Sequence, residues 1–569
     1  MSKKTSIILV VAVLVLCLGA SLCAGSFLVY RSIISKVQAT LMPREPTPGG
    51  RATRMPGEPT PRVRATRMPA DDGGVGVLRL VGGYPPTLDP AMSQDSTSAE
   101  YIVNIFSGLV TLDSQLEVVP DLAERWELSD DGLTYTFYLR ENAVFQDGKA
   151  ITSQDVIYSI ERACSVAMGS PVAASYLDDI VGVAEFASGE ARSISGLSAP
   201  DKRTVVITID APKAYFLAKL TYPASFVVDR EQVEGDYEAF LESPNGSGPF
   251  VLESISRDRI VLVRNALYYR EPAKLERVEF NLAGGDPMTM YENGLLDIVD
   301  VGSSAIERIL DPVNPLNAEL SSSSELSIQY ISFDVEMPPF DDPNIRRAFT
   351  MAIDREKLAH LVMLGTAEAA KGILPPSMPG YNDALEGLPY DPAKARKLLA
   401  ASRYGRPGQM PELVLSVTGT SGHMDDITRA VLYMWEENLG VKVNVEQVAW
   451  EDFLDDMNRR TYQMYSSGWI ADYPDPQNFV DLLFHSRSSQ NHAGYNNPEV
   501  DRLLEAARVA ESPDERYALY HQAEALIVED APWLPLTHGI EYTLVKPYVQ
   551  GFHSASAIYP WLIDISVNQ

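Results

Sequence analysis

Two strand-then-helix units, one directly after the other, limit most strongly how this chain can fold. Apolar runs at residues 413–417 and 441–445 predict strands, and each precedes a stretch of helical periodicity, at residues 424–439 and 451–460. Strands that alternate with helices favour a parallel sheet with helices packed on its faces. The pattern therefore predicts an α/β domain in which ligands bind at the carboxyl ends of the strands.

A further short strand, predicted at residues 462–466, leads into a loop that contains glycine, proline and aromatic residues, Ser467–Pro476. Gly468 loosens the backbone, and the two prolines disfavour a helix in the residues that precede them. Trp469 and Asp472 would then lie at the carboxyl end of the sheet, as a flat apolar wall beside one carboxylate. Such a pair is suited to binding rather than to catalysis.

The segment from Gly468 to Tyr473 resembles the signature loop of the family 5 extracellular solute-binding proteins, the oligopeptide- and dipeptide-binding proteins of ABC importers. In peptide-binding members, the aspartate of this loop pairs with the α-ammonium of the peptide and the tryptophan lines a side-chain pocket. The resemblance assigns these roles to Asp472 and Trp469 and places Ala471 in the same site. The residues alone leave another interpretation open, because aspartate before prolines commonly forms a turn or caps a helix.

Two further segments carry candidate ligand contacts. Trp450 resembles a second pocket tryptophan of the oligopeptide-binding branch, with packing in the core as the alternative. The loop after Leu88-Asp89-Pro90 contains Asp95 and Ser96, to which the resemblance gives backbone contacts with the ligand. A plain surface turn is the alternative for that loop.

The resemblance extends over residues 77–565, with further matching motifs at residues 122–156, 246–250 and 339–349. It implies an α/β protein with a two-lobed periplasmic-binding-protein fold of type II and an extra inserted subdomain. The implied parts are lobe I at residues 77–106, 228–325 and 530–569, the inserted subdomain at 107–227, and lobe II at 326–529. Two chain crossings, near residues 325 and 530, would form a hinge on which the lobes close over the ligand.

An uncharged apolar run of 24 residues, Ile7–Tyr30, follows Lys3 and Lys4. At about 1.5 Å per residue it is long enough to cross a hydrocarbon core of about 30 Å. The lysines favour a cytoplasmic N-terminus. We expect a membrane anchor, with a cleaved signal peptide and a lipoprotein signal as alternatives. Residues 31–76 contain a tandem repeat rich in proline and arginine, which is typical of a disordered linker.

Charge and motifs exclude several classes of function. The net charge is −30, of which residues 1–70 carry +8 and the rest −38, so nucleic acid is not an expected partner. Cys164 is the only cysteine outside the apolar run, and its place in a helical pattern predicts a buried thiol. The seven histidines lack metal-ligand spacing, and the chain has no nucleophile-elbow, zincin or P-loop motif. We expect no catalytic, metal or cofactor site.

The predicted function is capture of short peptides, by a monomer at the extracytoplasmic face of the cell membrane, for the transmembrane subunits of an ABC permease. The N-terminal segment would hold the protein at the membrane. Strand edges pair well with an extended peptide, whatever its sequence. Two alternatives stay open: the same fold with a non-peptide solute such as an oligosaccharide, a nickel chelate or haem, and a membrane-anchored sensor.

Overall fold

The part of the chain that the computed structural model describes, residues 76–553 and 559–568, is an α/β structure within one compact unit, Asp71–Gln569. The predicted membrane segment Ile7–Tyr30 and all of the predicted linker except Gly76 lie outside these residues. Within residues 76–553 and 559–568, no helix is long and apolar enough to cross a membrane.

The largest sheet has eight strands, of which six follow the order β11-β18-β13-β17-β15-β16, while β12 and β14 also pair with β18. The strands are β11 (Ile298–Asp300), β12 (Leu320–Ser324), β13 (Ser327–Phe333), β14 (Ala367–Ala369), β15 (Val414–Thr418), β16 (Asn444–Val448), β17 (Met464–Ile470) and β18 (Trp533–Val545). Strand β15 is parallel to both β16 and β17, which confirms the arrangement predicted for the strand-then-helix units. The sheet as a whole is mixed, because β13 runs antiparallel to β17 and β18.

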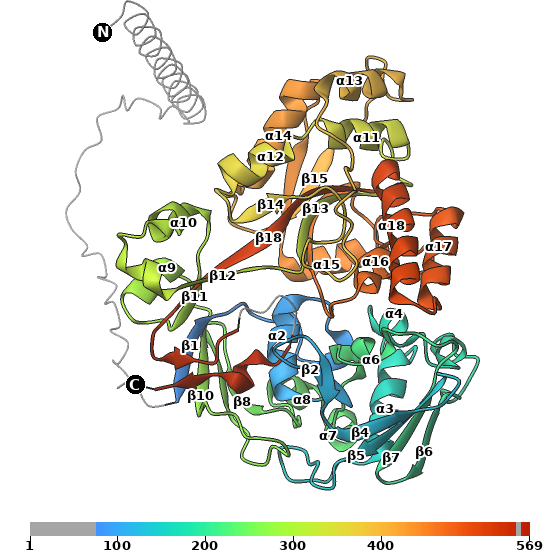
Figure 1. Cartoon of the computed structure of the whole chain (residues 1–569), viewed down its shortest axis with the longest axis vertical. Helices are drawn as coiled ribbons and strands as arrows, with labels where there is room; N and C mark the ends of the chain where they lie inside the picture. Colours follow the sequence, from blue (N-terminus) through green and yellow to red (C-terminus); the bar gives the residue numbers. More distant parts are fainter. Residues whose placement is uncertain (1–75, 554–558, 569) are drawn as a thin grey trace, which may run out of the picture. The chain divides into compact units, whose positions relative to one another are not determined.

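Helices from the second half of the chain pack around this sheet (Figure 1). They are α11 (Pro343–Met351), α12 (Arg355–Lys357), α13 (Pro392–Ala401), α14 (Asp426–Leu439), α15 (Trp450–Asn458), α16 (Val480–Phe484), α17 (Pro498–Arg508) and α18 (Pro513–Asp530). Helix α14 begins where the Asp425 carboxylate accepts a hydrogen bond from the Thr428 amide, and it ends at Gly440, whose φ is 70°. Its fully buried Trp435 donates a 3.0 Å hydrogen bond to the carbonyl of Phe349, which joins α14 to α11.

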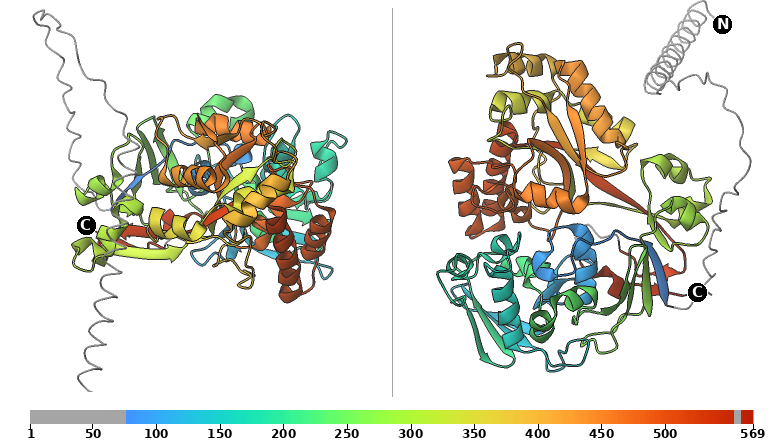
Figure 2. Two further views of the ribbon diagram at one scale, coloured as in Figure 1. Left: turned by 90° about the horizontal axis from the view of Figure 1, so that it is seen from above. Right: turned by 180° about the vertical axis from the view of Figure 1, so that it is seen from behind.

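Two smaller four-stranded sheets and their helices form the other side of the molecule (Figures 1 and 2). One has the order β1-β10-β9-β8 and the other β4-β5-β7-β6. The strands are β1 (Val77–Val81), β8 (Phe250–Ile255), β9 (Arg259–Arg264), β10 (Arg277–Asn281), β4 (Ala123–Leu128), β5 (Thr134–Leu139), β6 (Leu197–Asp201) and β7 (Thr204–Thr208). The main helices here are α2 (Ser96–Ile105), α3 (Ser153–Cys164), α4 (Ala173–Leu177), α7 (Arg230–Gly235) and α8 (Tyr237–Glu242).

Helix α3 follows the sequence signals closely. Thr152 and Asp155 form a capping box at its start, and Val156 and Ile160 are buried in the core. Cys164 is buried, as predicted, and burial raises the pKa of its thiol to about 12. The thiol is therefore a core group and not a reactive one.

Within the large sheet, β18 forms a ribbon with the successive strands β12 and β13, and this ribbon extends toward β11. The first half of β18 pairs with β13, and its second half pairs antiparallel with β12, from Ile540 opposite Ser324 to Leu544 opposite Leu320. The register of the pairing with β13 shifts between Pro535 and Thr537, and Pro535 has no amide hydrogen to donate. This ribbon lies close to residues 325 and 530, where the sequence analysis places the two chain crossings.

Two strands differ from the sequence analysis by more than two residues at an end, β16 and β17. Strand β17 was expected to end at Ser466, but it continues through Gly468 to Ile470, because it pairs along its whole length with β13 and Trp469 lies opposite Ile328. Strand β16 begins at Asn444 rather than at residue 441. Val441 and Val443, just before it, pack against the core beside α14.

Candidate ligand-binding site

A cavity of about 550 Å³ lies at the carboxyl ends of the parallel strands, as the sheet pattern predicts. One wall is formed by Val417 and Thr418 at the end of β15 and by residues 466–470 of β17. The opposite wall includes Tyr222 and the residues at the start of α2. The cavity therefore lies where the second half of the chain meets the first.

Asp472 follows β17 directly and lines this cavity, although only 6% of its surface is exposed. Its Oδ2 accepts hydrogen bonds from the Tyr176 hydroxyl and, at 2.8 Å, from Nδ2 of Asn478. Its Oδ1 has no hydrogen-bond partner among residues 76–553 and 559–568. Burial raises the pKa of Asp472 to about 6, although both hydrogen bonds favour its charged form. A buried carboxylate with one unpaired oxygen is suited to binding a cation.

The alternative interpretation of Asp472 as a helix cap does not apply. The carboxylate that caps the following short helix, η5 (Pro476–Asn478), is that of Asp475, whose Oδ1 accepts a 2.9 Å hydrogen bond from the Gln477 amide. Asp475 also pairs with Arg516 at 2.5 and 2.8 Å. The two aspartates of the loop thus have separate environments.

Both candidate tryptophans line the cavity. Trp469 lies in β17, where its Nε1 donates a 3.2 Å hydrogen bond to Oδ1 of Asn478. Trp450 is the first residue of α15; its ring is 5.9 Å from that of Phe453, and 37% of its surface is exposed. The core-packing alternative for Trp450 is therefore wrong, since a core tryptophan would not be exposed to this extent.

The other three candidate residues differ in their placement. Asp95 is the N-cap of α2, where its Oδ1 accepts a 3.0 Å hydrogen bond from the Ser98 amide, and it lines the cavity together with Ser96. Ala471 is fully buried, does not line the cavity, and its amide donates to the carbonyl of Leu326 at 2.8 Å. Ala471 thus fixes the loop to the start of β13 and presents no side chain to the cavity.

Sequence reasoning missed three side chains that organise the site: Tyr176, Tyr222 and Asn478. The Tyr176 and Tyr222 rings stack with their centroids 3.8 Å apart, and the Tyr222 hydroxyl donates to the carbonyl of Ser93 at 2.9 Å. Tyr176 and Asp472 are 296 residues apart in the sequence, so no local pattern could have paired them. Asn478 lies only six residues from Asp472, and an asparagine close behind the loop was a usable signal.

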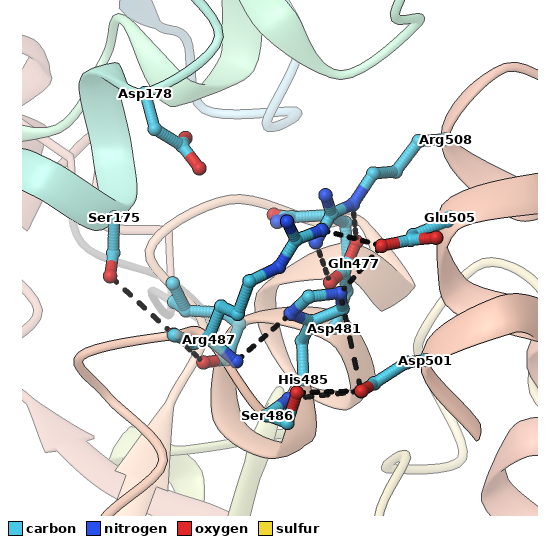
Figure 3. Close-up of polar contacts among 12 residues, drawn as sticks. Ser175, Asp178, Gln477, Asp481, His485, Ser486, Arg487, Asp501, Glu505 and Arg508 are labelled. Atoms are coloured by element: carbon cyan, nitrogen blue, oxygen red, sulfur yellow. Dashed lines mark hydrogen bonds and ion pairs between the residues drawn. The ribbon is translucent and has the colours of Figure 1, made fainter. Parts of the chain in front are cut away.

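Direct contacts join the two walls beside the cavity. The hydroxyls of Ser175, on α4, and Ser489 lie 2.8 Å apart, and Nδ2 of Asn458 donates to Oε1 of Gln94 at 2.7 Å. Figure 3 shows the surroundings of Ser175, where Ser175 and Asp178 face the α16–α17 region.

Arg508 on α17 forms an ion pair in that region. It pairs with both oxygens of Asp481, each at 2.7 Å. Burial disfavours the charged guanidinium, yet the carboxylates of Asp481 and Asp178 hold the pKa of Arg508 above its usual range. This ion pair joins α17 to α16.

The fold and the site together define a class: a two-lobed α/β binding protein with a cavity beside the contact between its lobes. The sequence matches the model of the bacterial extracellular solute-binding proteins, family 5 (middle part), over residues 117–491. The chain belongs to this family, whose members bind solutes.

Similar proteins with known names include the probable deoxycholate-binding periplasmic protein YgiS of Escherichia coli, 30% identical over 82% of this chain and 89% of that protein. The dipeptide-binding protein DppE of Bacillus subtilis is 28% identical over 82% of this chain and 87% of that protein. In each case the alignment extends over nearly the whole of the relative.

The structure of the Escherichia coli murein tripeptide-binding protein MppA has a TM-score of 0.78 and 27% identity, and covers 86% of this chain and 98% of that one. A second MppA structure, described as the unliganded open form, has a TM-score of 0.62 and 28% identity, and covers 87% and 97%. These matches establish the two-lobed periplasmic-binding-protein fold that the sequence analysis predicted.

Proposed function

We propose that this protein captures short peptides outside the cytoplasm and delivers them to the transmembrane subunits of an ABC permease. The observation that carries the proposal is the Asp472 carboxylate, which is buried on the cavity wall with one oxygen unpaired. A carboxylate in this setting stabilises the α-ammonium of a peptide once both groups have lost their water. The names of the relatives support the choice of peptides, since two of them are named for dipeptides or a murein tripeptide.

The remaining polar and aromatic groups complete the proposed peptide site. Trp469 and Trp450 provide flat apolar walls for side chains, and a cavity of about 550 Å³ leaves room for water around small ones. Asp95 and Ser96 face the ligand from the start of α2. The roles of these residues as ligand contacts are part of the proposal.

The proposed cycle is opening and closing about the ribbon of β12–β13 and β18. The residue limits given above for lobe I, the inserted subdomain and lobe II are part of this proposal. The contacts beside the cavity and the higher TM-score with one MppA structure than with its open form, 0.78 against 0.62, support a closed arrangement here. A peptide bound across the contact would favour this arrangement, because only the closed protein gathers both walls around it.

The proposed setting is the extracytoplasmic face of the cell membrane, with a monomer held there by the N-terminal segment. The sequence of Ile7–Tyr30 supports this part of the proposal. Fractionation of cells that express the full chain, with and without residues 1–30, tests it, because an anchor keeps the protein in the membrane fraction.

The experiment that tests peptide capture is calorimetric titration of the full-length protein with Ala-Ala-Ala and with its N-acetylated form. Loss of one partner of a buried charge pair costs about 2–5 kcal/mol, so we expect acetylation and Asp472→Asn each to weaken binding by about 30-fold or more. Asp391→Asn is the matched control, because it makes the same chemical change at the N-cap of α13. Equal affinity for both peptides would contradict the assigned role of Asp472.

A further inference from the structure

The charged groups that line the cavity are all acidic. They are Asp95, Asp425 and Asp472, and none of the lining residues described is a lysine or an arginine. His492 also lines the cavity, but burial, assisted by the charge of Arg460, lowers its pKa to about 4, so it is neutral at physiological pH. A ligand inside this cavity therefore meets negative charge and no positive charge from the wall.

The three carboxylates are not equivalent. Asp425 is exposed, and each of its oxygens accepts a hydrogen bond from Thr428, at 2.7 Å from the amide and 2.6 Å from the hydroxyl. Asp95, in contrast, is only 8% exposed. Its Oδ1 accepts from the Ser98 amide, whereas its Oδ2 is buried and has no hydrogen-bond partner. Asp95 forms no ion pair with any residue in the described ranges.

An unpaired buried carboxylate oxygen is costly, because it has lost its water and gained nothing in exchange. Among the fully buried side-chain atoms without a partner in the described part of the chain, Oδ2 of Asp95 is the only carboxylate oxygen. The start of α2 partly offsets the cost, since a helix N-terminus favours a negative charge. Asp95 lines the cavity, and no donor in residues 76–553 and 559–568 satisfies its Oδ2.

Asp95 and Asp472 lie at two ends of one aromatic stack. Tyr176 donates to Asp472 and stacks on Tyr222, and Tyr222 donates to Ser93, two residues before Asp95. Burial, followed by the negative charges of Asp472 and Asp95, raises the pKa of Tyr222, so both carboxylates are close to its ring. Asp95 and Asp472 therefore line one cavity, and the Tyr176–Tyr222 stack connects them.

We propose that the cavity binds a ligand with two cationic groups, one at Asp472 and the other at Oδ2 of Asp95. In a peptide these groups are the α-ammonium and the side chain of a lysine or arginine near the amino end. This proposal rests on the peptide site described above and narrows its substrate class to basic peptides. A free polyamine also carries at least two ammonium groups, so the test includes a polyamine.

Matched ligands isolate the second charge. The full-length protein is titrated in a calorimeter with Lys-Ala-Ala, with norleucine-Ala-Ala, whose side chain has similar length and no charge, and with spermidine. A charge pair at Asp95 predicts that the lysine peptide binds about tenfold more tightly or better. Asp95→Asn should reduce this preference to less than about twofold, while Asp391→Asn, at the N-cap of α13, should leave it unchanged.

Asparagine also caps helices well, so Asp95→Asn is expected to fold, and its thermal unfolding is recorded beside the titrations. Equal affinity for the lysine and norleucine peptides overturns the proposal, as does a lysine preference that survives Asp95→Asn. Both results leave peptide capture intact if Ala-Ala-Ala still binds through Asp472. Binding of spermidine alone, weakened by Asp95→Asn, supports the dicationic ligand and refutes peptide capture.

Discussion

Replacing Asp472 by asparagine should stabilise the ligand-free protein while it weakens peptide binding. The carboxylate is buried and lacks a cationic partner in the described part of the chain, so its charged form is disfavoured in the folded state. Oδ1 of an asparagine can accept the same hydrogen bonds from Tyr176 and Asn478. The substitution therefore removes the buried charge and keeps the packing.

The magnitude follows from the pKa. The pKa of Asp472 is about 6 in the folded protein, against 3.8 for an unperturbed aspartate. This difference corresponds to about 3 kcal/mol. Because the pKa is raised on folding, this carboxyl group contributes its full stability below pH 4 and loses it as the pH rises through about 6. The asparagine variant has no such group, so its advantage in free energy of unfolding should grow by about 3 kcal/mol between pH 4 and pH 7.

The assay is denaturant or thermal unfolding of the wild type and Asp472→Asn, without ligand, at several pH values from 4 to 8. For a unit of about 500 residues, an advantage of 3 kcal/mol corresponds to a Tm about 3 °C higher. Taking the difference between two proteins at each pH cancels the other titrating groups. A difference that does not change with pH, or a variant that is less stable at pH 7, would refute the reasoning.

Two further predictions use other features of the structure. Tyr176→Phe removes one hydrogen bond to Asp472, so the pKa of Asp472 should rise further and the pH below which peptide affinity falls should increase by about one unit, measured by titration at a series of pH values. Gly246→Ala should destabilise the protein by about 2 kcal/mol or more, because the added Cβ would lie 2.1 Å from the carbonyl oxygen of Ile105. Gly235→Ala, in α7 with open space around it, is the control and should be neutral or stabilising in the same unfolding experiment.

The fold was largely predictable, because periodicity and caps are local signals. The strand-then-helix units, the capping box of α3 and the buried Cys164 follow from residues close together in the sequence. The end of β17 was not predictable in this way. Its extension to Ile470 depends on pairing with β13, more than a hundred residues earlier, and outweighs the flexibility of Gly468.

The sequence predicted the candidate site residues in the second half of the chain but not the two tyrosines in the first half. Asp472, Trp469 and Trp450 stand in a recognisable loop and helix start, and the structure places all three on the cavity. Tyr176 and Tyr222 are ordinary tyrosines in the sequence, and their role arises only when a distant helix meets the loop. Ala471 was grouped with the site because it stands between lining residues, although its side chain points into the core.

The shift of register at Pro535 has a mechanical consequence. Since the proline cannot donate, the ladder between β13 and β18 lacks one backbone hydrogen bond there, so bending at that point costs less than it would in an uninterrupted ladder. The hinge proposed above would then have a smaller intrinsic preference for its closed arrangement. In the proposed cycle, the balance between the open and closed arrangements would depend on the ligand in the cavity.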